Sequence, residues 1–371
     1  MMRIAVVSTL VTFAVAASAA AQQPRITNGR VVPQAAGSNL DRTFRGLAAA
    51  QTEPAWIGYS VPVVSGERMM CCGSGDGMWI SDGVVFTNGR WSGCGLEGDR
   101  AAARIQSGQN PPPPPTPLKL EGPENLVVLY RLEDKAVQKI RIFSPDCELD
   151  AGGRTIHWLD AVRPADSVAL LSTFVAREEQ KRDRLTESAI AAIAMHKDDA
   201  ADAALDRFVS TGQPDFLRKK AVFWLGNTRG RRGFEAVRRI AKDDPSDDVR
   251  KRAMFALSQS REPEALQALI QFARQDASAK VRGEAIFWLA QKAGRRAAEE
   301  ITTAIEQDPD TEVKKRAVFA LSQLPKDEGV PLLIQVARTN KNPVVKKQAM
   351  FWLGQSHDPR ALDFFAEVLS K

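Results

Sequence analysis

The sequence predicts two structural parts: a small, mainly-β (α+β) N-terminal domain stapled by disulfides, and an all-α solenoid of about six helix pairs. Three observations support this prediction. A phenylalanine-centred segment recurs every 32 residues in the second half, short alternating apolar runs fill the first half, and all four cysteines lie in the first half. A repeated helix pair favours a solenoid, because each pair can bury its apolar stripes only against its neighbours.

The first 21 residues have the pattern of a cleavable signal peptide. Arg3 precedes an apolar run at residues 4–17, and a tail of small residues ends at Ala21. The run is too short to cross a bilayer comfortably, and no later segment is apolar enough to do so. We therefore expect a periplasmic or secreted protein whose mature chain has no transmembrane segment; an uncleaved anchor is the alternative.

The rest of the chain divides into four predicted segments: a flexible leader at 22–50, a mainly-β cysteine-containing domain at 51–164, a linking helix at 165–184 and the solenoid at 185–371. Within the β domain, alternating apolar residues at 126–132 and 136–143 predict a β-hairpin, and residues 155–159 predict a third strand.

The cysteines Cys71, Cys72, Cys94 and Cys147 are the disulfide candidates. An even number of cysteines in an oxidising compartment predicts up to two disulfides, and the sequence leaves their connectivity open. Adjacent cysteines rarely bond to each other, so pairing of Cys71 and Cys72 with the other two is geometrically easier. No CxxC motif or clustered set of ligands is present, so we expect neither a redox motif nor a metal site.

The repeat is defined by five phenylalanines with constant spacing (255 − 223 = 32, and so on): Phe223, Phe255, Phe287, Phe319 and Phe351. Each unit contains two helical patterns. In one unit, Val249, Ala253 and Leu257 form an apolar stripe on the first helix, and Leu266 and Leu269 lie on the second. A degenerate unit at residues 188–208 lacks the phenylalanine, as expected of a terminal capping repeat, and brings the total to six.

The first helices share the pattern V-[RK]-x-x-A-x-x-[AW]-L-[GSA], which resembles the short HEAT-like repeats of bacterial proteins, the group that includes the phycobilin-lyase-type repeats. The resemblance covers the C-terminal half only, and it implies a fold but no particular function. Some HEAT-repeat proteins are metal-dependent hydroxylases with paired His-Glu motifs. Here the only histidines are His157, His196 and His357, and none is followed by Glu, so that activity and its metal cofactor are not implied.

Three positions on the first helix recur at i, i+4 and i+8 and therefore lie along nearly one line. They hold a cation, a phenylalanine and an amide in most units: Lys219, Phe223, Asn227; Lys251, Phe255, Gln259; Phe287, Gln291; Lys315, Phe319, Gln323; Lys347, Phe351, Gln355. One interpretation is a binding ridge, because aromatic rings, cations and amides together suit extended polymers or peptides. The other is structural: each ring wedges between adjacent helices and each amide caps a helix-end carbonyl.

Two further columns are interpreted as structural. Cations at Arg218, Arg250, Arg282, Lys314 and Lys346, with Asp244, Asp276 and Asp308 nearby in the sequence, predict ion pairs that bridge successive loops. The tryptophans Trp224, Trp288 and Trp352 alternate with alanines in the intervening units, which favours core packing of large against small side chains.

The function that these features favour is an exported protein-interaction scaffold or adaptor with an unidentified protein partner. The formal charge of +6 and the pI of about 9.2 do not by themselves indicate nucleic acid in an exported protein, and no cofactor is expected. No nucleophile or metalloprotease motif assigns catalytic residues. The alternatives are an enzyme or enzyme subunit with its active site in the β domain, where His157 could act as a base, and a binder of anionic envelope polymers.

Overall fold

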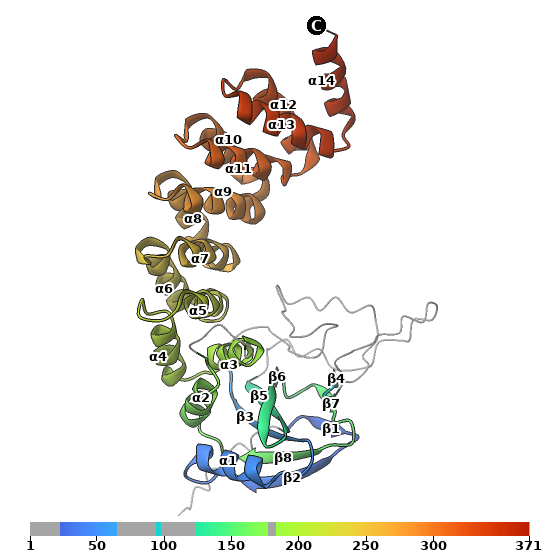
Figure 1. The fold of residues 1–371 in the computed structure, drawn as a ribbon, viewed down its shortest axis with the longest axis vertical. Coiled ribbons are helices and arrows are strands. Elements are labelled where there is room, and N and C mark those ends of the chain that lie inside the picture. The colour runs from blue at the N-terminus through green and yellow to red at the C-terminus, as the bar shows by residue number, and fades with distance from the viewer. Residues whose placement is uncertain (1–22, 65–93, 98–123, 177–182, 371) are drawn as a thin grey trace, which may run out of the picture.

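The computed structural model describes residues 23–64, 94–97, 124–176 and 183–370 (Figure 1). The N-terminal part is built on β-strands and lies at one end of the molecule, and the remaining helices stack away from it in an elongated column. The signal-peptide candidate, Cys71 and Cys72 lie outside the described residues.

The described residues of the N-terminal part form two sheets. Its elements are β1 Arg25–Thr27, β2 Arg30–Ala35, α1 Leu40–Ala50, β3 Ala55–Pro62, β4 Cys94–Gly95, β5 Asn125–Glu133, β6 Ala136–Phe143, β7 Glu148–Asp150, β8 Thr155–Asp160 and α2 Pro164–Ser172. The larger sheet has the order β2-β8-β3-β5-β6, with β2, β8 and β3 parallel and β3, β5 and β6 antiparallel. A small parallel sheet has the order β1-β7-β4.

The five-stranded sheet separates two apolar layers, because successive side chains of a strand point to opposite faces. On one face Ile57 and Tyr59 belong to the main core, which also includes buried residues of α1, α2 and α3. On the other face Trp56 and Trp158 pack with Leu149 of the small sheet. The N-terminal part therefore has three layers: helices, large sheet and small sheet.

The predicted hairpin is confirmed as β5 and β6, and the predicted third strand lies within β8. The hairpin turns through Asp134 and Lys135, both with positive φ (50° and 60°), a conformation that matches the twist of the flanking strands. The β-containing domain is thus present in the described part of the chain.

The prediction of a flexible leader at residues 22–50 is wrong for its described part. β2 pairs in parallel with β8 along its whole length, from Arg30↔Thr155 to Ala35↔Asp160. Helix α1 then buries Leu40, Phe44 and Ala48, which recur every four residues and give it one apolar face. The segment is ordered because a partner strand from the far end of the domain and the main core both hold it.

Six helix pairs follow. They are α3 Asp183–Met195 with α4 Asp199–Phe208, α5 Asp215–Thr228 with α6 Gly230–Asp243, α7 Asp247–Gln259 with α8 Ala265–Gln275, α9 Ala279–Ala293 with α10 Ala298–Gln307, α11 Thr311–Ser322 with α12 Lys326–Thr339, and α13 Pro343–Gln355 with α14 Pro359–Leu369; a short 3-10 turn, Gly294–Ala297, precedes α10. From α4 to α13 the two members of each pair lie on opposite sides of the column (Figure 1). The predicted helical solenoid is confirmed.

Helix starts and close packing follow from local residue choice. The Asp310 carboxylate accepts hydrogen bonds from the backbone N–H groups of Glu312 and Val313, so it caps the start of α11. Between α5 and α7, a Cβ placed on Gly226 would lie 2.8 Å from the Cβ of Ala256. The two helices can approach this closely only because position 226 has no side chain.

The solenoid and the β domain share one hydrophobic core, which runs from α1 and the large sheet into α14. Backbone hydrogen bonds also join them: Val64 N–H donates to the Met195 carbonyl (2.9 Å), and Lys197 N–H donates to the Pro62 carbonyl (3.0 Å). The end of β3 is therefore fastened to the end of α3. Among the described residues, no helix combines the length and apolarity needed to span a bilayer.

Candidate functional site

The candidate site is a line of aromatic rings on the first helices of the last five pairs, which we call the aromatic column. Its members are Phe223, Phe255, Phe287, Trp288, Phe319, Phe351 and Trp352. Because the solenoid repeats without insertion, equivalent side chains of successive units meet in register. The structure thus brings the predicted phenylalanines together into one feature.

The column alternates two kinds of contact. The rings of Phe223 and Phe255 are stacked, with centroids 5.7 Å apart and planes 5° apart, and Phe287 and Phe319 stack in the same way at 5.7 Å and 3°. Between these pairs Trp288 contacts Phe255 at 4.5 Å. The geometry is that of favourable offset and tilted aromatic pairs, so the rings form a continuous line along the solenoid.

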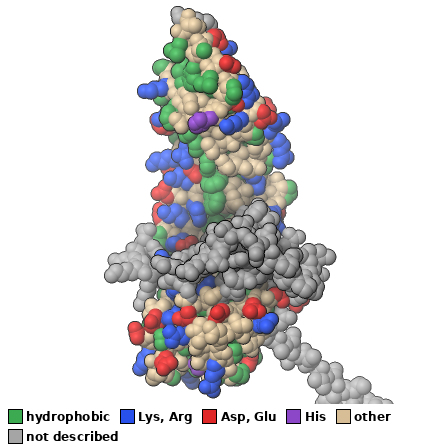
Figure 2. Space-filling view, turned by 90° about the vertical axis from the view of Figure 1, so that its right-hand side faces the viewer, with side chains coloured by type: hydrophobic (Ala, Val, Ile, Leu, Met, Phe, Trp, Pro, Cys, Tyr) green, Lys and Arg blue, Asp and Glu red, His purple; other side chains and the backbone are tan. Residues whose placement is uncertain are grey.

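The column is neither core nor fully exposed. Its phenylalanines are partly buried, except that 54% of Phe351 is exposed. Figure 2, viewed from the side of the first helices, shows hydrophobic side chains along the upper part of the molecule with Lys and Arg side chains on both sides. Ring surface is therefore accessible beside cationic groups.

The prediction that all three tryptophans are core residues is right for Trp224, which is 2% exposed, and wrong for Trp288 and Trp352, which are only partly buried. The difference lies in the preceding unit. Trp288 packs against a phenylalanine there, whereas the unit before Trp224 has the buried Ala191 at the phenylalanine position. The two partly buried tryptophans are therefore column members that sequence reasoning assigned to the core.

The predicted cations and amides flank the column. Lys251 pairs with Asp248 (2.7 Å) and Lys315 with Glu312 (2.9 Å), both on their own helices. Lys219 and Lys347 have no ion-pair partner within the described ranges. Lys219 and Lys347 therefore add positive charge beside the rings of their own helices.

Two of the amides, Gln259 and Gln323, bond to a neighbouring serine and not to a helix-end carbonyl. Gln259 donates from Nε2 to the Ser258 hydroxyl (3.1 Å), which in turn donates to the Phe255 carbonyl (2.7 Å). Gln323 and Ser322 repeat this arrangement two units later. The serine hydroxyl therefore bonds to the carbonyl, and the amide bonds to the serine hydroxyl. Asn227, Gln291 and Gln355 occupy the same helix position in the other units.

The predicted loop-bridging ion pairs are confirmed in three units. Arg218 donates to Asp244 (2.9 Å), Arg250 to Asp276, and Arg282 to Asp308 (2.7 and 2.9 Å). Each arginine reaches the aspartate that precedes the next first helix, so it ties one unit to the next. In the fourth unit Lys314 instead donates to the Glu306 carbonyl (2.8 Å).

Two polar clusters occur in the β domain. Glu97 accepts hydrogen bonds from Trp56 Nε1 (2.7 Å) and from Arg131 (2.8 and 3.0 Å). Burial acts to raise the pKa of Glu97, but the hydrogen bonds from Arg131 and Trp56 outweigh it and lower that pKa. His157 lies on β8, and burial lowers its pKa, which favours the neutral form of its imidazole.

The second cluster is a buried chain of hydrogen bonds that joins the β domain to the solenoid. Tyr130 and Tyr59 share a hydrogen bond (2.6 Å), Tyr59 and Ser167 another (2.7 Å), and Ser167 contacts His196 Nε2 (2.7 Å). His196 Nδ1 lies 2.7 Å from the Ala192 carbonyl, which can only accept, so Nδ1 carries the proton. Nε2 is then an acceptor, and every donor in the chain points from Tyr130 toward His196.

Burial decides the protonation state of this chain. It raises the pKa of Tyr59 to about 12 and lowers the pKa of His196 to about 4. Ser167 and His196 make the contact of a nucleophile and its base, but both are fully buried. Their arrangement therefore serves to join the two parts of the chain.

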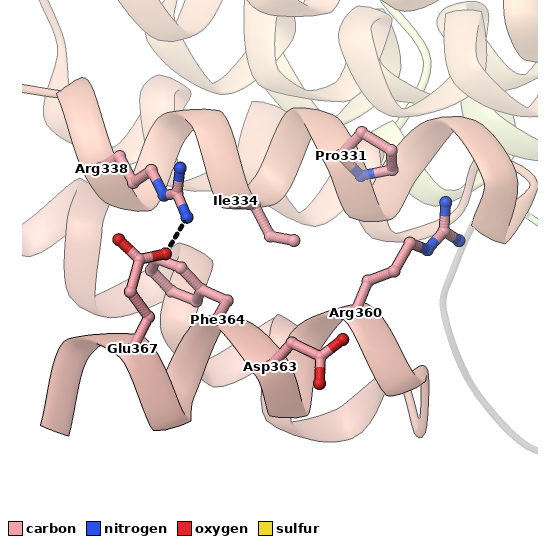
Figure 3. Close-up of a pocket in the computed structure, with 7 residues that line it drawn as sticks. All are labelled: Pro331, Ile334, Arg338, Arg360, Asp363, Phe364 and Glu367. Atoms are coloured by element: carbon pink, nitrogen blue, oxygen red, sulfur yellow. Dashed lines mark hydrogen bonds and ion pairs between the residues drawn. The ribbon is translucent and has the colours of Figure 1, made fainter. Parts of the chain in front are cut away.

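A groove of about 410 Å³ lies between α12 and α14 (Figure 3). Ile334 and Phe364 line it, and Arg338 pairs with Glu367 across it. With Arg360 and Asp363 the groove has two cations and two carboxylates, so it offers no excess of either charge to a ligand. The aromatic column has such an excess and is the better candidate site.

A family model described as HEAT repeats matches residues 213–290, 266–349 and 298–371. Residues 213–371 therefore consist of HEAT repeats, as the sequence resemblance implied. Comparison with curated proteins gives no match.

Comparison with solved structures finds matches, of which we report three. Human deoxyhypusine hydroxylase in complex with glycerol is 17% identical over 55% of this chain and 90% of its own, with a TM-score of 0.29. The complex of CpcE and CpcF of phycocyanin lyase from Nostoc sp. PCC7120 is 17% identical over 43% of this chain and 99% of its own, with a TM-score of 0.33. The YibA protein of E. coli is 23% identical over 52% and 70%, with a TM-score of 0.34. These likenesses concern the helical-repeat fold alone.

Proposed function

We propose that this HEAT-repeat chain is an exported protein-interaction scaffold that binds a protein partner along the aromatic column. The observation that supports this most directly is the continuity of the column: seven rings from five units line one side of the solenoid without interruption. Accessible aromatic rings next to cations and amides are typical of surfaces that bind extended peptide segments. HEAT-repeat solenoids commonly supply such extended surfaces.

Export is part of the proposal, and the signal-peptide pattern of residues 1–21 supports it. The test is to fractionate the cells of origin and sequence the N-terminus of the mature protein. Cleavage after Ala19 or Ala21 and recovery outside the cytoplasm are the expected results. A cytoplasmic protein that begins at Met1 would refute export.

An oxidising compartment would allow one disulfide between Cys94 and Cys147. Cys94 stands in β4, whose backbone pairs with β7 at Leu149, two residues beyond Cys147. The Cys147 side chain is fully buried in the smaller core. Tryptic mapping without reductant should give one linked peptide containing both cysteines; a linkage of either cysteine to Cys71 or Cys72 would assign a different pairing.

The scaffold function is tested by mild crosslinking in the cells of origin, followed by purification and mass spectrometry. The test variant carries Lys347→Ala, Phe351→Ser and Gln355→Ala, three exposed positions of α13. The matched control carries Arg239→Ala, Lys242→Ala and Gln271→Ala, exposed positions on the second helices α6 and α8.

The expected result is a defined protein that the wild type and the control retain and the test variant loses. Circular dichroism melting shows whether both variants are folded. If a folded test variant retains every partner of the wild type, the column is not the binding surface.

A further inference from the structure

One arginine beside the aromatic column has no bonded carboxylate among the described residues, whereas its counterpart two units later has one. The guanidinium carbon of Arg252 lies 4.7 Å from the ring centroid of Phe223 and 4.8 Å from that of Phe255. Burial lowers the pKa of Arg252, and within the described part of the chain no acceptor or carboxylate bonds to its N–H groups. The two rings contact this cation, and the Glu187 carboxylate acts on it electrostatically without a hydrogen bond. Among the described residues, its N–H donors therefore have no acceptor.

The counterpart is Arg316, two units later (316 − 252 = 64), beside the equivalent stacked pair Phe287 and Phe319. Arg316 Nη2 donates to the Glu284 carboxylate at 2.6 Å, and Trp288 Nε1 donates to the other oxygen of that carboxylate at 2.8 Å. At the equivalent repeat position the chain itself therefore supplies a carboxylate. The two arginines differ in their surroundings, because Arg252 is half-buried against two rings, whereas Arg316 is exposed and held by its ion pair.

At the Arg252 site this carboxylate is replaced by a cation. The position equivalent to Glu284 is Lys220 (284 − 64 = 220), which pairs with Glu187 at 3.2 Å. Within the described residues, Arg316 thus has a bonded carboxylate and Arg252 has none. Because Arg316 binds a carboxylate, a carboxylate is the group that we expect the Arg252 guanidinium to bind.

The charge around Arg252 agrees with a negative ligand. Lys219 and Lys280 both act on Asp248, the partner of Lys251, so these cations cluster beside the stacked pair. Counting them with Lys220 and Arg252 gives five cations against the carboxylates of Asp248 and Glu187, a net charge of +3. Such a cluster attracts an acidic segment and is screened by salt.

We propose that Arg252 binds an aspartate or glutamate side chain of an acidic, partly apolar peptide segment of the protein partner, laid along the aromatic column. This rests on the proposed scaffold function and names the chemistry of its partner. A guanidinium fixed between rings loses little rotamer freedom on binding, and its bidentate bonds to a carboxylate are of the strong, charge-assisted kind. The rings on either side contact the apolar residues of the segment.

The test measures fluorescence anisotropy of a fluorescein-labelled peptide in which Glu alternates with Leu and Ala, at low and at physiological salt. The same peptide with Gln in place of Glu is the ligand control. We expect Arg252→Gln to weaken binding about tenfold, the loss of one charge-assisted contact. The matched variant Arg316→Gln should change binding less than about twofold, because that arginine already has its carboxylate.

Two designed variants make the prediction independent of any loss of folding. Lys220→Glu gives Arg252 an internal carboxylate and should weaken binding as much as Arg252→Gln. Glu284→Gln frees Arg316 and should leave binding equal or tighter. Circular dichroism melting of each variant confirms that the fold is intact.

The proposal is overturned if the Glu and Gln peptides bind equally, or if Arg316→Gln is as damaging as Arg252→Gln. It is also overturned if polygalacturonate competes better than the acidic peptide with the same dependence on Arg252, since the ligand would then be a polymer. The scaffold function stands apart: it fails only if the crosslinked partner is indifferent to the α13 variant described above.

Discussion

Protonation of His196 should loosen the junction between the β domain and the solenoid. The imidazole is fully buried, its Nδ1 donates to the Ala192 carbonyl, and its Nε2 accepts from Ser167. A second proton would place a donor against the Ser167 hydroxyl and a charge in the core. The groups that act on His196 electrostatically are Asp198, which favours the charged form, and Arg229, which opposes it.

The magnitude follows from the difference in pKa between the two states. The pKa of His196 is about 4 in the folded protein and 6.5 for an ordinary histidine. Because the folded pKa is the lower one, the unfolded chain binds the proton more readily. The contribution of the neutral imidazole to the free energy of unfolding is therefore present above pH 6.5 and is lost as the pH falls toward 4. Between pH 7.5 and pH 5 the loss is about 2 kcal/mol, and it approaches ~3 kcal/mol once pH 4 is passed.

The assay is urea unfolding at pH 7.5, 6 and 5, followed by tryptophan fluorescence and far-UV circular dichroism. His196→Gln removes the titrating group, while Gln can still accept a bond from Ser167. The expected result is a smaller decrease in the free energy of unfolding for the variant, by about 2 kcal/mol over this range. The control His357→Gln, in an exposed loop, should decrease as the wild type does. Equal pH dependence of the wild type and His196→Gln would show that the junction does not rely on a neutral imidazole.

Two further predictions concern the solenoid. Gly226→Ala should lower the stability by about 1–3 kcal/mol, because the new Cβ would lie 2.8 Å from that of Ala256; an unchanged melting temperature would show that α5 and α7 can separate freely. Asp244→Ala should cost about 3 kcal/mol, because the buried Arg218 loses its buried carboxylate partner and keeps only the half-exposed Asp215 at 3.0 Å; thermal melting measures this, and a change below ~1 kcal/mol would mean that the bridge between units is dispensable.

The candidate site was only partly predictable from the sequence. Constant spacing placed Phe255 and its equivalents in one line, because i and i+4 positions share a helix face and the units stack in register. Repeat periodicity alone does not distinguish Arg252 from Arg316, because whether a carboxylate reaches a guanidinium depends on the distance between neighbouring helices. The signal was nevertheless present: comparing positions two units apart shows Lys220 where Glu284 stands later.

By itself, the sequence determined the repeat and its helix pairs, because each unit encodes local helices with apolar faces that only a neighbouring unit can cover. The tertiary structure decided everything that depends on distant pairing. It made the expected leader into β2 and α1 through a parallel strand from the other end of the domain, and it linked Tyr130 of β5, Tyr59 of β3, Ser167 of α2 and His196, which directly follows α3. Local periodicity contains no information on such contacts, since their energies arise only when segments far apart in the chain are brought together.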